Sequence, residues 1–466
     1  MPLPTIPSGN VNSGLATGYD VANSCRFDRG SSASMHITFS GAGDRQKFTF
    51  SFWVKRNKLG TQEVIFDTNF GGGANEHRIL FDSSDRLEYY DYSSTTNNLK
   101  YVTNRLFRDT AAWYSIIIAV DTTQGTAGNR VKIYINGTQE TSFGTETQPS
   151  ENLTTQLNTG VKHQIGVKNV SSNYLDAYLA EFVFISGTQY AASDFGEFDS
   201  DSPRIWKPKD VSGLTFGTIG YYLDFEDSSA LGNDVSGNNK DFTATNLAAT
   251  DQSTDTCTNN FATLNPLIPN SNITYSEGNL RSVQDGAGDN RISLSTMAVS
   301  SGKWYVEHKI TQIQDAVHTG IVAADSAYST SNSLSQMVNA FSYNNDGNVK
   351  EYNNSNIDTG EATYTAGDII GIALDMDNNK VYFHKNGTYI NSGNPAGNSN
   401  GYSITSGKEY YFAKAMNYAK YTDWNFGSPA FTISSGNADG NGYGNFEYAV
   451  PSGFYSLCTK NLAEYG

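Results

Sequence analysis

The chain has 466 residues, more than one hydrophobic core normally serves, and typical domain sizes predict about three domains. Aromatic residues make up 13% of the chain, charged residues only 17%, and 44 glycines are spread along it. Aromatic strands interrupted by turn residues predict an all-β protein. The net charge of −16 argues against partners that require clustered Lys and Arg, so we expect no nucleic acid and no anionic lipid.

The N-terminal residues 1–22 are rich in Pro, Gly, Ser and Asn and predict an arm or anchor. They contain neither the basic nor the apolar region of a secretory signal peptide. The purest apolar run, Ile116–Val120, is too short to cross a bilayer, so no membrane insertion is expected. Three widely spaced cysteines predict neither a disulfide framework nor a zinc site. We therefore expect synthesis in a reducing cytoplasm.

Residues 23–245 contain many short alternating strands separated by turn residues, which is typical of a β-sandwich. The clearest of these strands are Phe48–Val54, Trp113–Val120, Val131–Ile135 and Leu179–Phe184. The third runs directly into Asn136-Gly137, and this dipeptide favours a tight hairpin because both residues tolerate positive φ.

A group of tyrosines and asparagines within this module is the predicted ligand-binding site. Tyrosine rings can stack on the apolar face of a sugar, while asparagine side chains bond its hydroxyl groups. The alternative is that some of these tyrosines only fill cross-strand pairs in a sheet. The candidate residues are Tyr89, Tyr90, Tyr92, Asn97, Asn98 and Tyr101.

A loop near the end of the module concentrates oxygen-bearing side chains, among them Asp227, Asp234 and Asn238. Calcium takes about 6–8 oxygen ligands and tolerates irregular geometry, so these three residues are candidate Ca²⁺ ligands. Asp, Asn and Gly are also the residues of ordinary turns, and the alternative is that the protein has no cofactor.

The next segment, residues 246–279, is polar and contains Pro266 and Pro269, which predicts a linker. Residues 280–428 form a second module, in which another strand runs into Asn386-Gly387. Glycine-rich residues 429–466 predict a C-terminal extension, either a loose linker or a strand added to a neighbouring sheet. The expected fold is therefore all-β, with two tandem antiparallel β-sandwiches between a short arm and this extension.

The second module resembles a SPRY domain. The similarity rests on four motifs in the family's order: Gly302–Glu307, Gly367–Asp375, the hairpin through Asn386-Gly387, and Asn425-Phe426-Gly427. SPRY domains are non-catalytic binding sandwiches whose binding surface is built from variable loops, so the resemblance implies a binding module and transfers no contact residue.

The first module resembles the laminin G-like, concanavalin A-like jelly roll. The similarity rests on Ser51–Arg56, Asp109–Tyr114 followed by Val131–Gly137, and Ala180–Phe182. Glycosidases of this group would require Glu where Tyr222 stands, although Asp224 and Glu226 share one strand face. The sequence therefore predicts no catalytic residue and no enzyme.

A jelly roll, a SPRY domain and the closing motif Pro451–Phe454 together resemble virion proteins of tailed phages, marine-type phages above all. The resemblance implies a non-enzymatic tail or appendage fibre in the virion that binds a host surface glycan or protein. Alternatives are a capsid fibre, decoration or tail component that binds other virion proteins, and a polysaccharide depolymerase. A homo-oligomer, with a trimer favoured, would add avidity.

Overall fold

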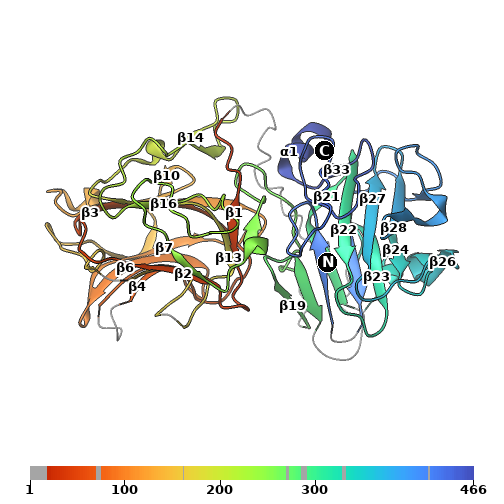
Figure 1. The fold of residues 1–466 in the computed structure, drawn as a ribbon, viewed down its shortest axis with the longest axis horizontal. Coiled ribbons are helices and arrows are strands. Elements are labelled where there is room, and N and C mark those ends of the chain that lie inside the picture. Colours follow the sequence, from red (N-terminus) through yellow and green to blue (C-terminus); the bar gives the residue numbers. More distant parts are fainter. Residues whose placement is uncertain are drawn as a thin grey trace. The chain divides into compact units, whose positions relative to one another are not determined.

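The computed structural model describes residues 18–69, 75–160, 162–169, 171–268, 272–284, 291–327, 332–417 and 420–466. The chain divides into two compact units, and it passes from the first to the second between Thr258 and Asn259. Figure 1 shows that each unit is built from layered β-strands. The predicted all-β class with two tandem antiparallel sandwiches is confirmed.

The first unit is a sandwich of two eight-stranded antiparallel sheets. Most strands of the first sheet lie in the order β10-β9-β8-β3-β13-β1-β18, and β16 also pairs with β13. Its strands are β1 (Ser24–Phe27), β3 (Lys47–Arg56), β8 (Trp113–Asp121), β9 (Val131–Ile135), β10 (Thr138–Gln139), β13 (Ala177–Ser186), β16 (Tyr221–Leu223) and β18 (Gln252–Ser253).

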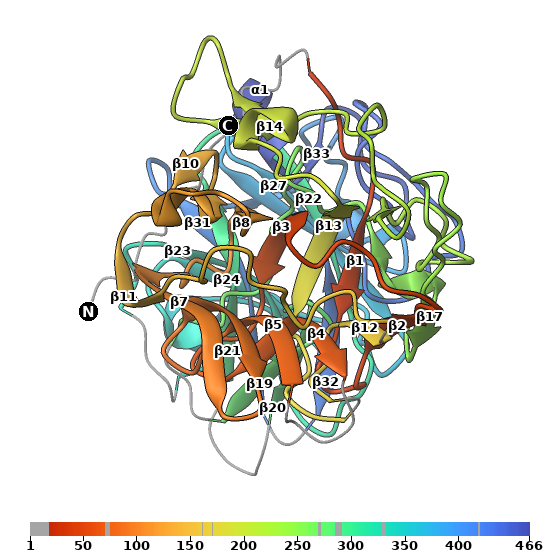
Figure 2. The same cartoon turned by 90° about the vertical axis from the view of Figure 1, so that its left-hand side faces the viewer.

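The second sheet has the order β11-β7-β6-β5-β4-β12-β2-β17. Figure 2 shows the labelled strands β7, β5 and β4 of this sheet in that order, and β6 pairs with both β7 and β5. The strands are β2 (Ser34–Thr38), β4 (Glu63–Asn69), β5 (Asn75–Phe81), β6 (Arg86–Ser93), β7 (Thr96–Leu106), β11 (Phe143–Thr147), β12 (Lys162–Ile165) and β17 (Thr243–Thr245); β14 (Gly196–Phe198) and β15 (Trp206–Pro208) form a separate hairpin.

The first sheet is buried on both faces. Alternation on β3 sends Phe48, Phe50 and Phe52 into the core between the sheets. Trp53 belongs to a second apolar cluster on the opposite face, which residues 190–222 help to form. This double burial explains why β13 is buried along its whole length.

Both predicted Asn-Gly hairpins are confirmed. Asn136 and Gly137 join β9 to β10 with φ of 48° and 73°. Asn386 and Gly387 have φ of 49° and 83° and occupy the equivalent turn in the second unit. In each case both turn residues adopt the left-handed conformation that a type I′ turn requires.

The packed part of the first unit extends beyond residues 23–245, the boundaries expected from the sequence. Val21, expected in the arm, is buried, and its N–H donates to Thr258 Oγ1 at 3.1 Å. Asp255, expected in the linker, is also buried. It forms an ion pair with Lys55, in which Lys55 Nζ lies 2.7 Å from Asp255 Oδ2. Residues 1–17 of the expected arm lie outside the described residues.

The second unit is also a sandwich. The larger sheet has the order β19-β20-β32-β22-β27-β28-β29, with β30 pairing β28 and β33 pairing β22 in parallel. Its strands are β19 (Ile273–Ser276), β20 (Arg281–Gln284), β22 (Lys303–Lys309), β27 (Ile369–Asp375), β28 (Lys380–Lys385), β29 (Thr388–Tyr389), β30 (Tyr402–Ser403), β32 (Tyr421–Asn425) and β33 (Tyr455–Ser456).

The smaller sheet of the second unit has the order β21-β31-β23-β24-β25-β26. Its strands are β21 (Arg291–Val299), β23 (Val317–Ala323), β24 (Ala340–Asn344), β25 (Val349–Glu351), β26 (Ser355–Asp358) and β31 (Tyr410–Met416). Helical structure in the described chain is limited to α1 (Thr459–Tyr465) and to 3₁₀ turns at Ala127–Asn129, Ala192–Asp194, Ala249–Asp251, Leu334–Gln336, Tyr352–Asn354 and Ile390–Ser392.

The C-terminal extension is an integral part of the second unit. Phe446 and Phe454 pack against Tyr305 on β22. The stretch before α1 runs beside the first residues of the unit, because the N–H of Thr459 donates to the Asn260 carbonyl at 2.9 Å. Strand addition, one of the two expected possibilities, therefore describes the extension through β33.

Glu307 on β22 fastens this extension. Its carboxylate accepts the backbone N–H groups of Glu447 at 3.0 Å and Tyr448 at 2.8 Å, together with the Asn425 amide at 3.1 Å. The buried carboxylate is tolerated within the strand because the extension supplies two of these donors and β32 supplies the third.

We expect Glu307→Ala to destabilise the docked extension by about 2 kcal/mol, because several donors lose their acceptor. Proteolysis and hydrogen exchange of residues 437–456 in the full chain would measure the loss. Glu447→Ala is the matched control, since that carboxylate accepts only from exposed Ser434 and Ser435. Equal exchange rates in the two variants would refute the fastening role.

Candidate ligand-binding surfaces

The predicted tyrosine cluster is divided between two faces of the second sheet. Neighbouring residues on a strand point in opposite directions. Tyr89 and Tyr101 form a cross-strand pair inside the core, with 0% and 3% of their surface exposed. The prediction that these two residues bind a ligand is wrong, and the alternative, a structural pair, is correct.

Tyr90 lies on the outer face of the sheet, within a polar row that crosses four strands. Asp67, Arg78, Tyr90 and Lys100 are consecutive partners on β4, β5, β6 and β7. Arg78 Nε donates to Asp67 Oδ1 at 2.8 Å, and its guanidinium also donates to the Tyr90 hydroxyl. Burial raises the pKa of Tyr90, while nearby Arg78 lowers it by a smaller amount. The hydroxyl therefore stays protonated.

Both cations flank the ring of Tyr90. The guanidinium centre of Arg78 lies 5.4 Å from the ring centroid, and Lys100 Nζ lies 5.7 Å from it. Lys100 also pairs with Glu88 at 2.7 Å. These contacts hold the ring in place from both neighbouring strands.

A second row on the same outer face runs through Glu76, Tyr92 and Asn97. It is linked to the first because the Tyr90 hydroxyl donates to Glu76 Oε2 at 2.9 Å. Tyr92 is half-buried and Asn97 is exposed. Asn98, also a predicted ligand-binding residue, instead stabilises the hairpin, because its amide donates to Asp91 Oδ1 at 2.7 Å.

We call Glu76, Tyr90, Tyr92, Asn97 and Lys100 the Tyr90 face. It offers two tyrosine rings spaced by two residues on β6, with carboxylate, amide and ammonium groups around them. Rings of this kind give apolar contact area and a polar tip, and the surrounding groups can bond hydroxyls. Such a surface suits a polyhydroxylated ligand. Its charged members, Glu76 and Lys100, were not predicted from the sequence.

The candidate calcium ligands are used for other contacts. The Asp234 carboxylate accepts from the N–H groups of Tyr222, Ser236 and Lys240 at 2.8–2.9 Å, and also from the Ser236 hydroxyl. Asn238 donates its amide to two backbone carbonyls. Hydrogen bonds from Ser229 lower the pKa of Asp227.

These contacts are those of ordinary turns, which was the alternative to a calcium site. Calcium binding by the three residues stays a prediction. Across the described residues, no group of three or more His, Cys, Asp or Glu side chains is arranged to hold a metal ion.

The same loop encloses a pocket of about 330 Å³, which is at the lower end of ligand-site sizes. Small side chains and a few polar groups dominate its walls. The lining residues are Ser228, Ser229, Ala230, Leu231, Gly232, Asn233, Asp241, Phe242, Ala244, Leu247, Ala248 and Ala249.

Family models match a segment of each β-sandwich unit. Residues 29–190 match the family model described as the concanavalin A-like lectin/glucanases superfamily, of laminin G type, and residues 303–393 match the SPRY domain model. The first unit contains a laminin G-like jelly roll, and the second contains a SPRY domain. A comparison with curated proteins finds no match.

Solved structures show distant likeness. A human SPRY domain is 14% identical, covering 35% of this chain and 98% of that one, with a TM-score of 0.26. A Bacteroides ovatus protein described as carbohydrate-binding is 13% identical, with coverages of 48% and 58% and a TM-score of 0.34. Domains LG4-5 of the mouse laminin alpha1 chain are 10% identical, with coverages of 85% and 82% and a TM-score of 0.29.

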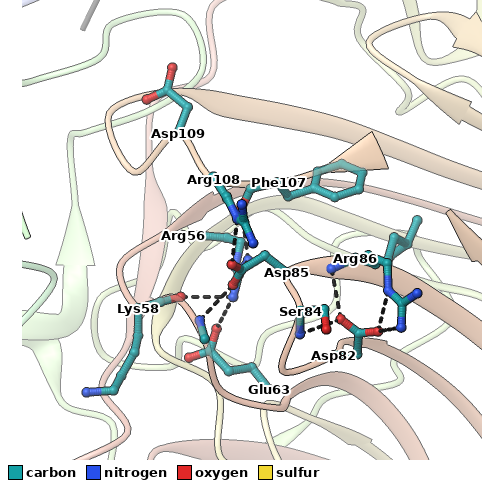
Figure 3. Close-up of polar contacts among 12 residues, drawn as sticks. Arg56, Lys58, Glu63, Asp82, Ser84, Asp85, Arg86, Phe107, Arg108 and Asp109 are labelled. Atoms are coloured by element: carbon teal, nitrogen blue, oxygen red, sulfur yellow. Dashed lines mark hydrogen bonds and ion pairs between the residues drawn. The ribbon is translucent and has the colours of Figure 1, made fainter. Parts of the chain in front are cut away.

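The jelly roll also holds a buried ion-pair network at one end of β3 (Figure 3). The Arg56 guanidinium contacts Asp85 at 3.2 Å and Glu63 at 3.1 Å, and it donates to the carbonyls of Phe107 and Lys58. These four groups of the protein engage the guanidinium, and Arg56 is 0% exposed. The network therefore joins strand ends and presents no surface to a ligand.

Glu181 is a buried carboxylic acid that the prediction of sites missed. It has φ of 52° at an irregularity in the pairing of β13 with β3, and it accepts from the Tyr222 hydroxyl at 2.7 Å. Burial raises its pKa to about 8. A single acid inside the apolar run Leu179–Phe184 was the available signal.

The two carboxylates considered for glycosidase chemistry lie beside this acid. Asp224 accepts the N–H of Glu226 at 3.1 Å, and Glu226 is exposed. Burial raises the pKa of Asp224. Glu181, which has the raised pKa of a general acid, is only 6% exposed, so substrate cannot reach it in this arrangement.

Among the described residues, no helix has both the length and the apolar character needed to cross a membrane.

Proposed function

We propose that the protein is a non-enzymatic binding protein of a tailed-phage virion, a tail or appendage fibre that recognises a glycan on the host surface. The observation that carries the binding site is the Tyr90 face, where two tyrosines and hydrogen-bonding side chains share one side of a sheet. The virion setting is supported by the order of a jelly roll and a SPRY domain, which resembles such proteins.

Recognition of a glycan follows from the chemistry of this face. The tyrosine rings would stack on the apolar side of a sugar ring, and Glu76, Asn97 and Lys100 would bond its hydroxyls. The contacts of Tyr90 with Arg78 and Glu76 fix the ring before binding, which reduces the entropy lost on association.

We expect Tyr92→Ala to weaken binding to host-cell polysaccharide roughly tenfold, which corresponds to about 1.4 kcal/mol. Surface plasmon resonance on immobilised host polysaccharide would measure it. Tyr352→Ala is the matched control, because Tyr352 is an exposed tyrosine (45%) of the other unit. Unchanged affinity in Tyr92→Ala would refute the assignment of the Tyr90 face.

The place in the virion is tested separately. Saturating purified protein should block adsorption of the phage that encodes it, and labelled antibody should mark the tail periphery. Label on capsomers would instead support the capsid-fibre alternative, with other virion proteins as partners. A trimer in solution, measured by light scattering, would provide the expected avidity.

Absence of catalysis is part of the proposal. Polysaccharide turnover by the isolated protein that is lost in Asp224→Ala or Glu226→Ala would establish the depolymerase alternative.

A further inference from the structure

A layer of polar side chains crosses the interior of the SPRY sandwich, where apolar residues are the rule. On β31, Phe412 and Met416 belong to the core, so Lys414 between them points inward as well. Its partners on the neighbouring strands are Thr319 of β23 and Ser293 of β21. These three residues form one buried row on the smaller sheet.

The larger sheet presents a second polar row to the first. His308 of β22 is paired with Trp424 of β32, and their rings stack with centroids 4.5 Å apart. Thr422, two residues before Trp424 on the same strand, is paired with Ser282 of β20. All four residues are fully buried.

Two hydrogen bonds show that the rows face each other. His308 Nδ1 lies 2.8 Å from Thr319 Oγ1, which joins the sheets at one side. The hydroxyl of Tyr275 on β19 donates to Ser293 Oγ at 3.4 Å, which joins them at the other. Lys414 is paired with Thr319 on one side and Ser293 on the other, and its side chain is fully buried.

Five polar atoms of this layer are buried and have no hydrogen-bond partner among the described residues. They are Lys414 Nζ, His308 Nε2, Trp424 Nε1, Thr422 Oγ1 and Ser282 Oγ. Buried polar groups in proteins are nearly always hydrogen-bonded, and leaving one unsatisfied is costly. Their concentration in one layer points to a partner from outside the chain.

The chemistry of four of these five groups selects the partner. The ammonium of Lys414 and the indole N–H of Trp424 can only donate, and the two hydroxyls can donate as well. The neighbouring carboxylate, Asp423, is engaged by Arg281 at 2.6 Å and by Thr311. Burial lowers the pKa of Lys414 to about 7, and Asp423 opposes this shift. A negatively charged acceptor would offset the burial of that ammonium.

We propose that this layer is a binding site for a small monovalent inorganic anion of the halide type, held by Lys414, Trp424, Thr422 and Ser282. The anion accepts from donors on both sheets and so ties them together. Its role is independent of glycan binding, because the site lies in the SPRY domain and the Tyr90 face lies in the jelly roll.

Bromide is the probe. Crystals of the full chain grown with sodium bromide should show an anomalous peak within hydrogen-bond distance of Lys414 Nζ. In solution, a bromide concentration about ten times its dissociation constant should slow hydrogen exchange of β22 and β31 roughly tenfold relative to sodium gluconate at equal ionic strength. Jelly-roll peptides should show no such change.

Lys414→Met should abolish both the peak and the protection. Lys408→Met is the matched control, since Lys408 belongs to the same domain and makes an exposed pair with Asp325. Should Lys414→Met fail to fold, Thr422→Val removes one donor without a charge and should weaken the protection. An ordered water in place of the anomalous peak, or protection that persists in Lys414→Met, would overturn the proposal.

Discussion

Replacing Arg56 by methionine is expected to lower the free energy of unfolding of the jelly roll by about 3–5 kcal/mol. The side chain is 0% exposed, and its guanidinium is the shared partner of Glu63 and Asp85. Its loss also leaves the carbonyls of Phe107 and Lys58 without this donor. Removal of one member of a buried network costs much more than the pair contributes, because the remaining groups stay buried.

Arg108 provides a matched control at the same acid. It contacts the other oxygen of Asp85 at 2.9 Å, but its side chain is 57% exposed. Arg108→Met should therefore cost less than about 1 kcal/mol. Urea unfolding of the full-length variants, followed by hydrogen exchange of jelly-roll peptides, would measure both values. Equal losses in the two variants would contradict the role assigned to burial.

The second large effect concerns pH and Glu181. Because its pKa is raised from 4.5 to about 8 in the folded protein, the folded state holds a proton that the unfolded state has already released. Stability from this group is complete below about pH 4.5 and is lost as the pH rises to about 8. Glu181→Gln should remove this loss and stabilise the jelly roll at pH 8 on the order of 3 kcal/mol.

Denaturant unfolding between pH 4.5 and 8.5 would test this expectation. Burial also raises the pKa of Asp176, to about 7, and the pKa of Glu63, where Arg56 opposes the shift. Both groups contribute a slope of the same sign, and the variant retains it. Glu226→Gln is the control, because this neighbouring carboxylate is exposed. A Glu181→Gln variant with the same pH profile as the wild type would contradict the assignment.

Local sequence signals predicted the framework well. Asn136-Gly137 and Asn386-Gly387 each predicted a turn with positive φ at both positions. Both turns occur at these residues, with positive φ at all four. Alternation in Phe48–Val54 likewise placed three phenylalanines in the core. Such features depend on neighbours within a few residues, and the sequence contains those neighbours.

Features that depend on distant partners were not predictable. Tyr89 and Tyr90 are adjacent and identical, and only the assembled sheet places one in the core and the other on the Tyr90 face. Part of the polar stretch that predicted a linker, including Asp255, is buried because remote groups such as Lys55 satisfy it. The Asp234 carboxylate likewise accepts from backbone N–H groups. The positions of these groups cannot be inferred from amino-acid composition.

The contact between Asn260 and Thr459 has a mechanical consequence for the SPRY domain. Two backbone hydrogen bonds join the entering and leaving segments, from Thr459 N to the Asn260 carbonyl and from Ala262 N to the Leu457 carbonyl. A pulling force applied between residue 259 and α1 would act first on this short seam. The seam would open bond by bond, while the sheets behind it would carry little of the load until it had separated.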